Sequence, residues 1–257
     1  MLLTHDLDGS GRVVLLLHSG VADRRMWEPL VPGVRPAFQV LRPDLRGFGD
    51  TPLPGGPYCD ADDVAALLDH HGIASAVVVG SSFGGRVALE LATLHPGRVE
   101  SLVLLCPGLR GVDPTPDAEA FDDAEERLLA AGDVEGAVRL NVDTWLGPAA
   151  DDATREALAT MQRRAFEVQL AADAVEPAPA PRRVEVDPGA IAAPTLVVAG
   201  GHDLDHFQNV AAHLAERIPG AEYLALPWAG HLPALERPEA VASLLLDRLL
   251  ADPADAR

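Results

Sequence analysis

AVVVGSSFGGRVALELATL, residues 76–94, contains the strongest structural signal in the chain. Its first four residues form a continuous apolar run, which is typical of a strand buried on both faces of a parallel sheet. Gly80-Ser81-Ser82-Phe83-Gly84 follows at once, and residues 84–94 then have the apolar spacing of a helix. A strand, a sharp Gly-x-Ser-x-Gly turn and a helix in this order predict that Ser82 stands at the carboxyl edge of a sheet.

Five other short apolar runs are also continuous rather than alternating, as in buried parallel strands. They cover residues 13–17, 38–41, 102–105, 195–199 and 223–226. Helical patterns lie between many of these runs, at residues 61–71, 84–94, 207–218 and 238–250. This alternation predicts an α/β fold with a mostly parallel, doubly wound sheet.

Residues 112–189 interrupt the alternation, because no run within them predicts a strand. Helical patterns cover residues 118–131, 134–145 and 152–173, with prolines near both ends of the stretch. Prolines at this density favour extended connectors. We therefore expect a core domain of residues 1–111 and 190–257 with a helical cap inserted at residues 112–189. The alternative is that the stretch simply covers one edge of the sheet.

The chain has 257 residues, a formal net charge of −19 and no lysine. Such a surface repels phosphate groups, so nucleic acids and anionic membranes are poor partners, and a small-molecule substrate is expected. Nothing in the sequence argues against a homo-oligomer. No signal peptide or transmembrane run is recognisable, and Cys59 and Cys106 form no disulfide framework. These features predict a cytoplasmic protein.

Ser82 is the candidate nucleophile. A sharp turn holds the residue at its centre in a strained conformation and exposes the side chain. Glycines on both sides let the strand and helix backbones approach closely, and the helix amino terminus offers free N–H groups to a developing oxyanion. The neighbouring Ser81 lacks the flanking glycine pair, so we expect it to point away.

A nucleophilic serine needs a base and an orienting acid. His231, in Ala229-Gly230-His231-Leu232, follows the strand at residues 223–226, and Asp203 follows the strand at residues 195–199. Both therefore lie at the carboxyl edge of the sheet, where sites in open α/β sheets collect. Asp205 is the competing acid, and Asp203 is preferred because it follows its strand more directly.

Gly20 is a candidate oxyanion donor, because His18-Ser19-Gly20 follows the strand at residues 13–17. The second donor would be the backbone N–H of Phe83, directly after the nucleophile. Taken alone, His18-Ser19-Gly20 favours an ordinary tight turn.

Residues 202–206 contain two histidines and two aspartates, which could suggest a metal site. A polar loop leading into a helix is the better interpretation, because no further ligand cluster is evident. No dinucleotide fingerprint or P-loop is present either, so neither a metal nor another cofactor is expected.

The chain resembles the α/β-hydrolase superfamily over nearly its whole length. The matching pieces are LLLHSG, RPDLRGFGDT, VVVGSSFGGRVALELA, VVAGGHDLDHF and AGHLPALERPEAV. The resemblance implies a catalytic triad of Ser82, Asp203 and His231, with the backbone N–H groups of Gly20 and Phe83 as oxyanion donors. It also implies that Asp44 holds a loop. The family commonly has His-Gly where this chain has His18-Ser19, so Val21 is an alternative to Gly20.

Within that superfamily the chain is similar to small capped serine hydrolases around 3-oxoadipate enol-lactonase and the meta-cleavage-product hydrolases. Serine at the turn argues against haloalkane dehalogenases and epoxide hydrolases, which use aspartate there. The resemblance implies hydrolysis of a small ester or lactone through an acyl-enzyme. The alternatives are hydrolytic C–C cleavage of a vinylogous diketone, with Arg86 or Arg110 as carboxylate partner, and ligand binding with little turnover.

Val21, Trp145 and Leu232 are the residues expected to line the substrate pocket. Trp145 ends a helical segment just before Gly147-Pro148, where a bend could turn the indole toward the triad, and a purely packing role is the alternative. A pocket of this kind in a strongly acidic protein predicts neutral, apolar substrates, unless a buried arginine overrides the general field.

Overall fold

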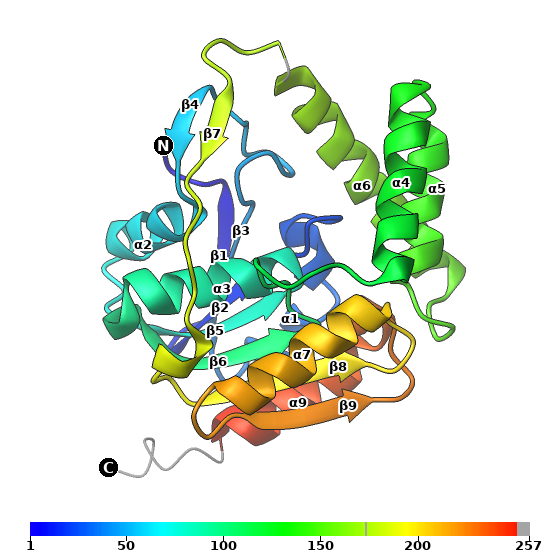
Figure 1. Ribbon diagram of the computed structural model, residues 1–257. Helices are drawn as coiled ribbons and strands as arrows, with labels where there is room; N and C mark the ends of the chain where they lie inside the picture. The colour runs from blue at the N-terminus through cyan, green and yellow to red at the C-terminus, as the bar shows by residue number, and fades with distance from the viewer. Residues whose placement is uncertain (173, 251–257) are drawn as a thin grey trace.

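The computed structural model describes residues 1–172 and 174–250 and has a seven-stranded sheet at its centre (Figure 1). The strands lie in the order β1-β3-β2-β5-β6-β8-β9. They are β1 His5–Asp8, β2 Val13–Leu17, β3 Gln39–Pro43, β5 Ala76–Ser81, β6 Val99–Leu105, β8 Thr195–Gly200 and β9 Glu222–Leu226. β1 pairs antiparallel with β3, and the other pairings in this sheet are parallel.

All six predicted strands are confirmed, and for the inner strands the physical reason is burial on both faces, whereas β9 is largely exposed. Every residue of β2, β5 and β8 is buried, so these segments need no polar side and appear in the sequence as continuous apolar runs. The structure adds β1, which the sequence analysis missed. Its residues His5–Asp8 are only half-buried at the sheet's edge and therefore carry no apolar run.

Helices cover both faces of the sheet, which confirms the doubly wound arrangement (Figure 1). One face packs against α2 Asp60–His70, α3 Phe83–Leu94 and α7 Asp205–Arg217, and the other against α1 Val31–Val34 and α9 Pro238–Leu250. Successive residues of β2 alternate between the two apolar clusters: Leu15 belongs to the first and Leu16 to the second. No helix in the described residues is long and apolar enough to cross a lipid bilayer.

Three helices follow β6 and lie together beyond the carboxyl edge of the sheet (Figure 1). They are α4 Pro116–Ala130, α5 Val134–Trp145 and α6 Asp152–Ala172, so the helical content expected between residues 112 and 189 is confirmed. The division into core and cap domains stays a prediction. Asp173, with which the third predicted helix ends, and residues 251–257 of the predicted core lie outside the described residues.

The expectation that residues 112–189 contain no strand was wrong at one point. Pro179–Pro181 forms β7, which pairs in parallel with β4 Gly56–Tyr58 in a separate two-stranded sheet. Proline cannot donate to a ladder, so a segment with two prolines gives no strand signal. The ladder forms because the neighbours take part: Gly56 donates to Ala178, and Arg182 donates to Tyr58.

Candidate active site

The residues proposed to react lie at one edge of the central sheet. Ser82 follows β5, Asp203 follows β8 and His231 follows β9. These strands are parallel, and only β6 separates β5 from β8 in the sheet. Their carboxyl ends therefore meet at the same edge, below the cap helices.

Ser82 has the backbone conformation that its turn requires, with φ +50° and ψ −110°. Positive φ is uncommon outside glycine and marks a strained turn. Both flanking glycines are sterically required. A Cβ at Gly80 would lie 2.4 Å from the Gly84 carbonyl oxygen, and a Cβ at Gly84 would lie 2.2 Å from that of Leu17. Ser81 is fully buried at the end of β5, so its hydroxyl is shielded from a substrate.

His231 and Asp203 form a buried hydrogen-bonded pair. His231 Nδ1 lies 2.7 Å from Asp203 Oδ2, and the two side chains are 2% and 1% exposed. The other carboxylate oxygen accepts from the N–H of Leu204 at 2.8 Å. Asp205, the competing acid, is exposed at the start of α7. The structure therefore brings Asp203, rather than Asp205, to the histidine.

The hydrogen bond to Asp203 also determines which ring nitrogen of His231 can accept a proton. A carboxylate only accepts, so Nδ1 carries the proton and Nε2 of the neutral ring keeps its lone pair. Among the described residues, no hydrogen bond joins the Ser82 hydroxyl to His231. Such bonds are often long in the absence of substrate and tighten when it binds.

The end of cap helix α5 packs directly on His231. The backbone N–H of His231 donates to the Trp145 carbonyl at 2.9 Å, and the two ring centroids are 4.7 Å apart. Phe207, from α7, lies at 4.1 Å on the same imidazole. Trp145 is 6% exposed, and its indole N–H donates to Asn141 Oδ1 at 2.8 Å. The tryptophan thus supports the histidine, as its expected orientation implied, and the sequence analysis missed Phe207.

Glu236 is a second residue that sequence reasoning missed. It ends α8 Pro233–Glu236, and its carboxylate accepts from the N–H of Gly230 at 2.9 Å. Burial raises the pKa of Glu236, while hydrogen bonds from backbone N–H groups, including that of Gly147, lower it. A buried carboxylate therefore joins the loop before His231 to the loop after α5. Its signal in the sequence is an acidic residue in an otherwise apolar stretch, ALE.

The two proposed oxyanion donors lie against each other. A Cβ built on Gly20 would be 3.3 Å from Phe83 Cβ, so the loop after β2 touches the start of α3. In the described part of the chain, no hydrogen-bond partner takes the N–H of Gly20, Val21 or Phe83. All three stay available as donors, and the contact with Phe83 favours Gly20 over Val21.

Asp44 holds the loops around this site, as the resemblance implied. Its buried carboxylate accepts from the N–H of Arg24 at 2.8 Å and from the N–H of Asp50 at 2.9 Å. His18 contributes in the same region, because Nε2 accepts from the N–H of Leu45 at 2.9 Å. Burial lowers the pKa of His18, so the ring stays neutral and can accept.

A cavity of about 540 Å³ reaches Phe83, the residue after Ser82. It passes beneath α6 to the β4–β7 pair. Its lining residues are Arg46, Phe48, Leu53, Tyr58, Asp60, Phe83, Arg86, Arg110, Gln169, Ala172, Ala178, Pro179 and Pro181. Val21, Trp145 and Leu232 do not line it, and their place in a pocket stays a prediction; Leu232 is fully buried and Val21 half-buried.

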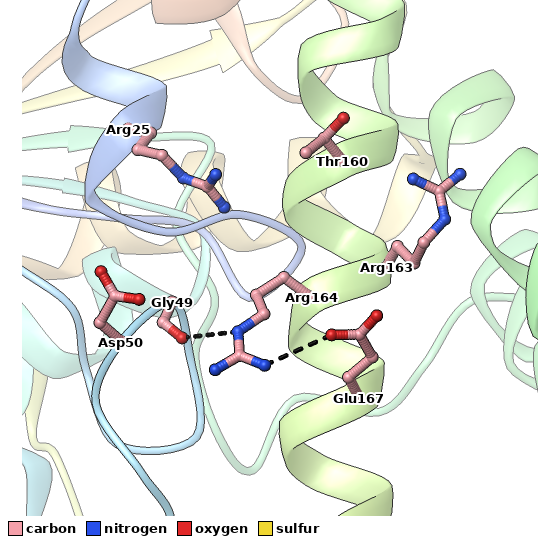
Figure 2. Close-up of a pocket in the computed structure, with 7 residues that line it drawn as sticks. All are labelled: Arg25, Gly49, Asp50, Thr160, Arg163, Arg164 and Glu167. Atoms are coloured by element: carbon pink, nitrogen blue, oxygen red, sulfur yellow. Dashed lines mark hydrogen bonds and ion pairs between the residues drawn. The ribbon is translucent and has the colours of Figure 1, made fainter.

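A smaller cavity, of about 300 Å³, lies between α6 and the loops that contain Arg25 and Gly49. Figure 2 shows Arg164 reaching from α6 toward the Gly49 carbonyl, which its Nε meets at 3.0 Å. Arg163, on the same helix, pairs instead with Glu135 of α5 at 2.6 Å. These contacts hold α6 to the core on one side and to the rest of the cap on the other.

One group in the described residues brings three potential metal ligands within 4.8 Å of one another: Cys106, Asp203 and His231. Burial and the nearby Asp203 charge raise the pKa of the Cys106 thiol well above its ordinary value. Cysteine binds a metal as the thiolate, which the raised pKa disfavours. Asp203 and His231 already form a hydrogen bond with each other. The group therefore fits a hydrogen-bonded cluster rather than a metal centre, and it does not include His202, Asp205 or His206.

Comparisons with known proteins agree with this architecture. The family model described as alpha/beta hydrolase fold matches residues 12–238. A pimeloyl-(acyl-carrier protein) methyl ester esterase of Neisseria meningitidis serogroup B is 32% identical over 250 residues, 91% of each chain.

Solved structures give the same answer. A thermophilic esterase from Thermogutta terrifontis, with malate bound, superposes with a TM-score of 0.80 at 28% identity, covering 96% of this chain and 93% of that one. The enol-lactonase from Burkholderia xenovorans LB400 superposes with a TM-score of 0.76 at 26% identity, and the match covers 96% of each chain. With its topology, its strained serine turn and these matches, the chain belongs to the α/β-hydrolase family.

Proposed function

We propose that this α/β-hydrolase cleaves a small carboxylic ester or lactone through an acyl-enzyme on Ser82. The observation that carries the proposal is the buried 2.7 Å hydrogen bond between His231 and Asp203 at the sheet edge where Ser82 has its strained turn. Relatives described as an esterase and an enol-lactonase support ester chemistry. The roles of the individual residues follow from the geometry around them.

In the first half-reaction, Ser82 Oγ attacks the substrate carbonyl while His231 Nε2 takes its proton. Asp203 keeps the proton on Nδ1 and stabilises the imidazolium that forms. The N–H groups of Gly20 and Phe83 would donate to the tetrahedral oxyanion. The intermediate collapses when His231 returns the proton to the leaving alkoxide, which departs as the alcohol, or stays attached if the substrate is a lactone.

In the second half-reaction, water attacks the acyl-enzyme and His231 accepts its proton. Collapse of the second tetrahedral intermediate returns a proton to Ser82 Oγ and releases the acid. Each step uses one base and one pair of backbone donors, so no further group is needed.

The direct test is Ser82→Ala, with Ser81→Ala as the matched control. We expect Ser82→Ala to abolish turnover of p-nitrophenyl esters and lactones, because the nucleophile is lost, and to leave the melting temperature nearly unchanged. A fluorophosphonate should label wild type at Ser82, located by peptide mass spectrometry. Labelling at another residue, or full turnover by Ser82→Ala, would show that the nucleophile is wrongly assigned.

A further inference from the structure

The cavity beside Phe83 has a charged wall that the reaction on Ser82 leaves unused. Arg86 and Arg110 line both this cavity of about 540 Å³ and a neighbouring one of about 630 Å³. They come from different segments, since Arg86 is on α3 and Arg110 follows β6. The apolar part of the wall includes Phe48 and Phe83, whose ring centroids are 5.5 Å apart.

Arg86 and the loop that precedes Arg110 are hydrogen-bonded to the backbone of the nucleophile. The carbonyl of Ser82 accepts from the N–H of Arg86 and from the N–H of Gly108, each at 3.0 Å. The guanidinium of Arg86 lies 4.5 Å from the centre of the Phe83 ring, a cation–π geometry that restricts the side chain. The Arg86 part of the charged wall therefore has a fixed position relative to Ser82, and Arg110, whose side chain is 39% exposed, lies beside it.

The two arginines share one acidic partner. Glu90 Oε1 lies 3.3 Å from Arg86 Nη1 and 3.6 Å from Arg110 Nε, and the Glu90 side chain is 2% exposed. Two guanidinium groups thus share a single carboxylate as ion-pair partner. Arg46, the third arginine of the cavity, already has its own partner, because it pairs with both carboxylate oxygens of Asp63.

Asp60, on the same cavity, is the independent sign of a missing polar partner. It is 7% exposed, and its Oδ1 is a buried oxygen without a hydrogen-bond partner among the described residues. A buried polar atom of this kind is costly unless a ligand or water completes it. It also limits the ligand's charge, because a dianion would be repelled by Asp60 and Glu90 together.

We propose that Arg86 and Arg110 form a subsite for a single carboxylate, so that the preferred substrates are esters carrying one free carboxylate away from the scissile bond. This inference rests on the proposed ester hydrolysis and adds its substrate class. Guanidinium groups bind carboxylates with strong, directional hydrogen bonds. The subsite replaces the neutral, apolar preference expected from sequence with an anionic one.

Two matched substrate pairs test the subsite. In the first pair, monomethyl adipate carries the free carboxylate on the acyl side and methyl hexanoate is its neutral counterpart. In the second pair, 6-acetoxyhexanoate carries the carboxylate on the alcohol side and hexyl acetate is its neutral counterpart. For at least one pair, we expect wild type to prefer the anionic member in kcat/KM. Arg110→Ala should reduce that preference about tenfold or more. Arg127→Ala, an exposed arginine of α4, is the matched control and should keep it.

Removing Arg86 alone would leave buried Glu90 with only the longer, 3.6 Å contact to Arg110 and endanger folding. The second variant therefore carries Arg86→Gln with Glu90→Gln, and its fold is checked by its melting temperature. Calorimetric binding of monomethyl adipate and 6-acetoxyhexanoate to Ser82→Ala, with and without Arg110→Ala, gives a readout without turnover. We expect Arg110→Ala to weaken binding of the preferred substrate about tenfold or more.

The outcomes separate the two proposals. Neutral esters cleaved as well as anionic ones, with Arg110→Ala changing neither the ratios nor the binding, would overturn the subsite and leave the hydrolase standing. No turnover of any ester and no labelling of Ser82 would overturn the proposed function. Arginine-dependent binding to Ser82→Ala would then still support the subsite, and its absence would overturn that as well.

Discussion

The backbone N–H of His231 donates a 2.9 Å hydrogen bond to the carbonyl of Trp145, which joins the proposed general base to the last residue of cap helix α5. The indole lies on the imidazole with a centroid separation of 4.7 Å. Helix α5 therefore supplies part of the surface that holds the histidine. Changes in this helix should reach the chemistry through this contact.

Trp145→Ala should lower both stability and activity. The indole is buried between Phe121, Phe207 and His231, so its removal should reduce the free energy of unfolding by about 3–5 kcal/mol. The imidazole also loses a packing partner, so kcat/KM should fall by a similar factor for short and long acyl chains. Urea unfolding and an ester series measure the two effects. A large change in acyl-chain preference with unchanged stability would instead assign the indole to the substrate pocket.

Asp203→Asn should reduce kcat by roughly 10⁴-fold, the size of the loss for the corresponding change in a serine protease. The amide can donate to Nδ1 and so favours the wrong tautomer of His231, whereas the shape of the site is kept. Asp205→Asn is the matched control, because Asp205 is exposed and its backbone N–H, not its carboxylate, contacts Asp117. Steady-state kinetics compares the two variants, and a larger loss in Asp205→Asn would exchange their roles.

Glu236→Gln should loosen the loop that carries His231. The carboxylate accepts from Gly230, and hydrogen bonding from Gly147 also stabilises its charged form. An amide replaces one of the two carboxylate oxygens with an NH2 group, which cannot accept from a backbone N–H, and a lost buried hydrogen bond costs about 1–3 kcal/mol. We expect a lower melting temperature and a kcat reduced by roughly tenfold with little change in KM, because misplacement of the base affects the chemical step. Glu239→Gln, on the first turn of α9, is the control, and equal effects in both variants would argue against this role.

The sequence predicts the parts of the site that lie on buried parallel strands. β5, β8 and their following turns are specified locally, since an apolar run, a glycine turn and a polar residue succeed one another along the chain. Ser82 and Asp203 could therefore be found without knowledge of distant contacts. The strands before these residues, β5 and β8, both pair in parallel with β6, as consecutive strands of a parallel sheet commonly do.

Residues that act through long-range packing could not be found in this way. Phe207 has an ordinary position in its helix, and the acidic residue in ALE does not say what Glu236 contacts; only the fold brings them to His231 and Gly230. Arg86 and Arg110 could be named from the sequence as candidate carboxylate partners, but for the same reason they could not be placed on one cavity wall. Arg86 and Arg110 lie 24 residues apart in sequence, and their common partner Glu90 becomes evident only when α3 and the loop after β6 meet.

Asp60→Asn should stabilise the protein in a pH-dependent way. Burial, with the nearby negative charges of Glu90 and Asp63, raises the pKa of Asp60 to about 6, against the opposing effect of Arg86 and Arg46. The carboxyl of an unfolded chain titrates near pH ~3.9. Between these values the native state holds the proton more tightly, so this group makes wild type less stable as pH rises from about 4 to 6.

Asparagine never ionises, so Asp60→Asn should remove this penalty. The variant should be more stable than wild type by on the order of 2 kcal/mol at pH 7.5, and the gain should disappear by about pH 4. Loss of a negative charge from the first turn of α2 offsets part of the gain, by about 0.3–1 kcal/mol. Urea unfolding of both proteins from pH 4 to 8 measures the difference, with exposed Asp123→Asn as the control. A gain that does not vary with pH would show that Asp60 is ionised as easily in the folded protein as in the unfolded chain.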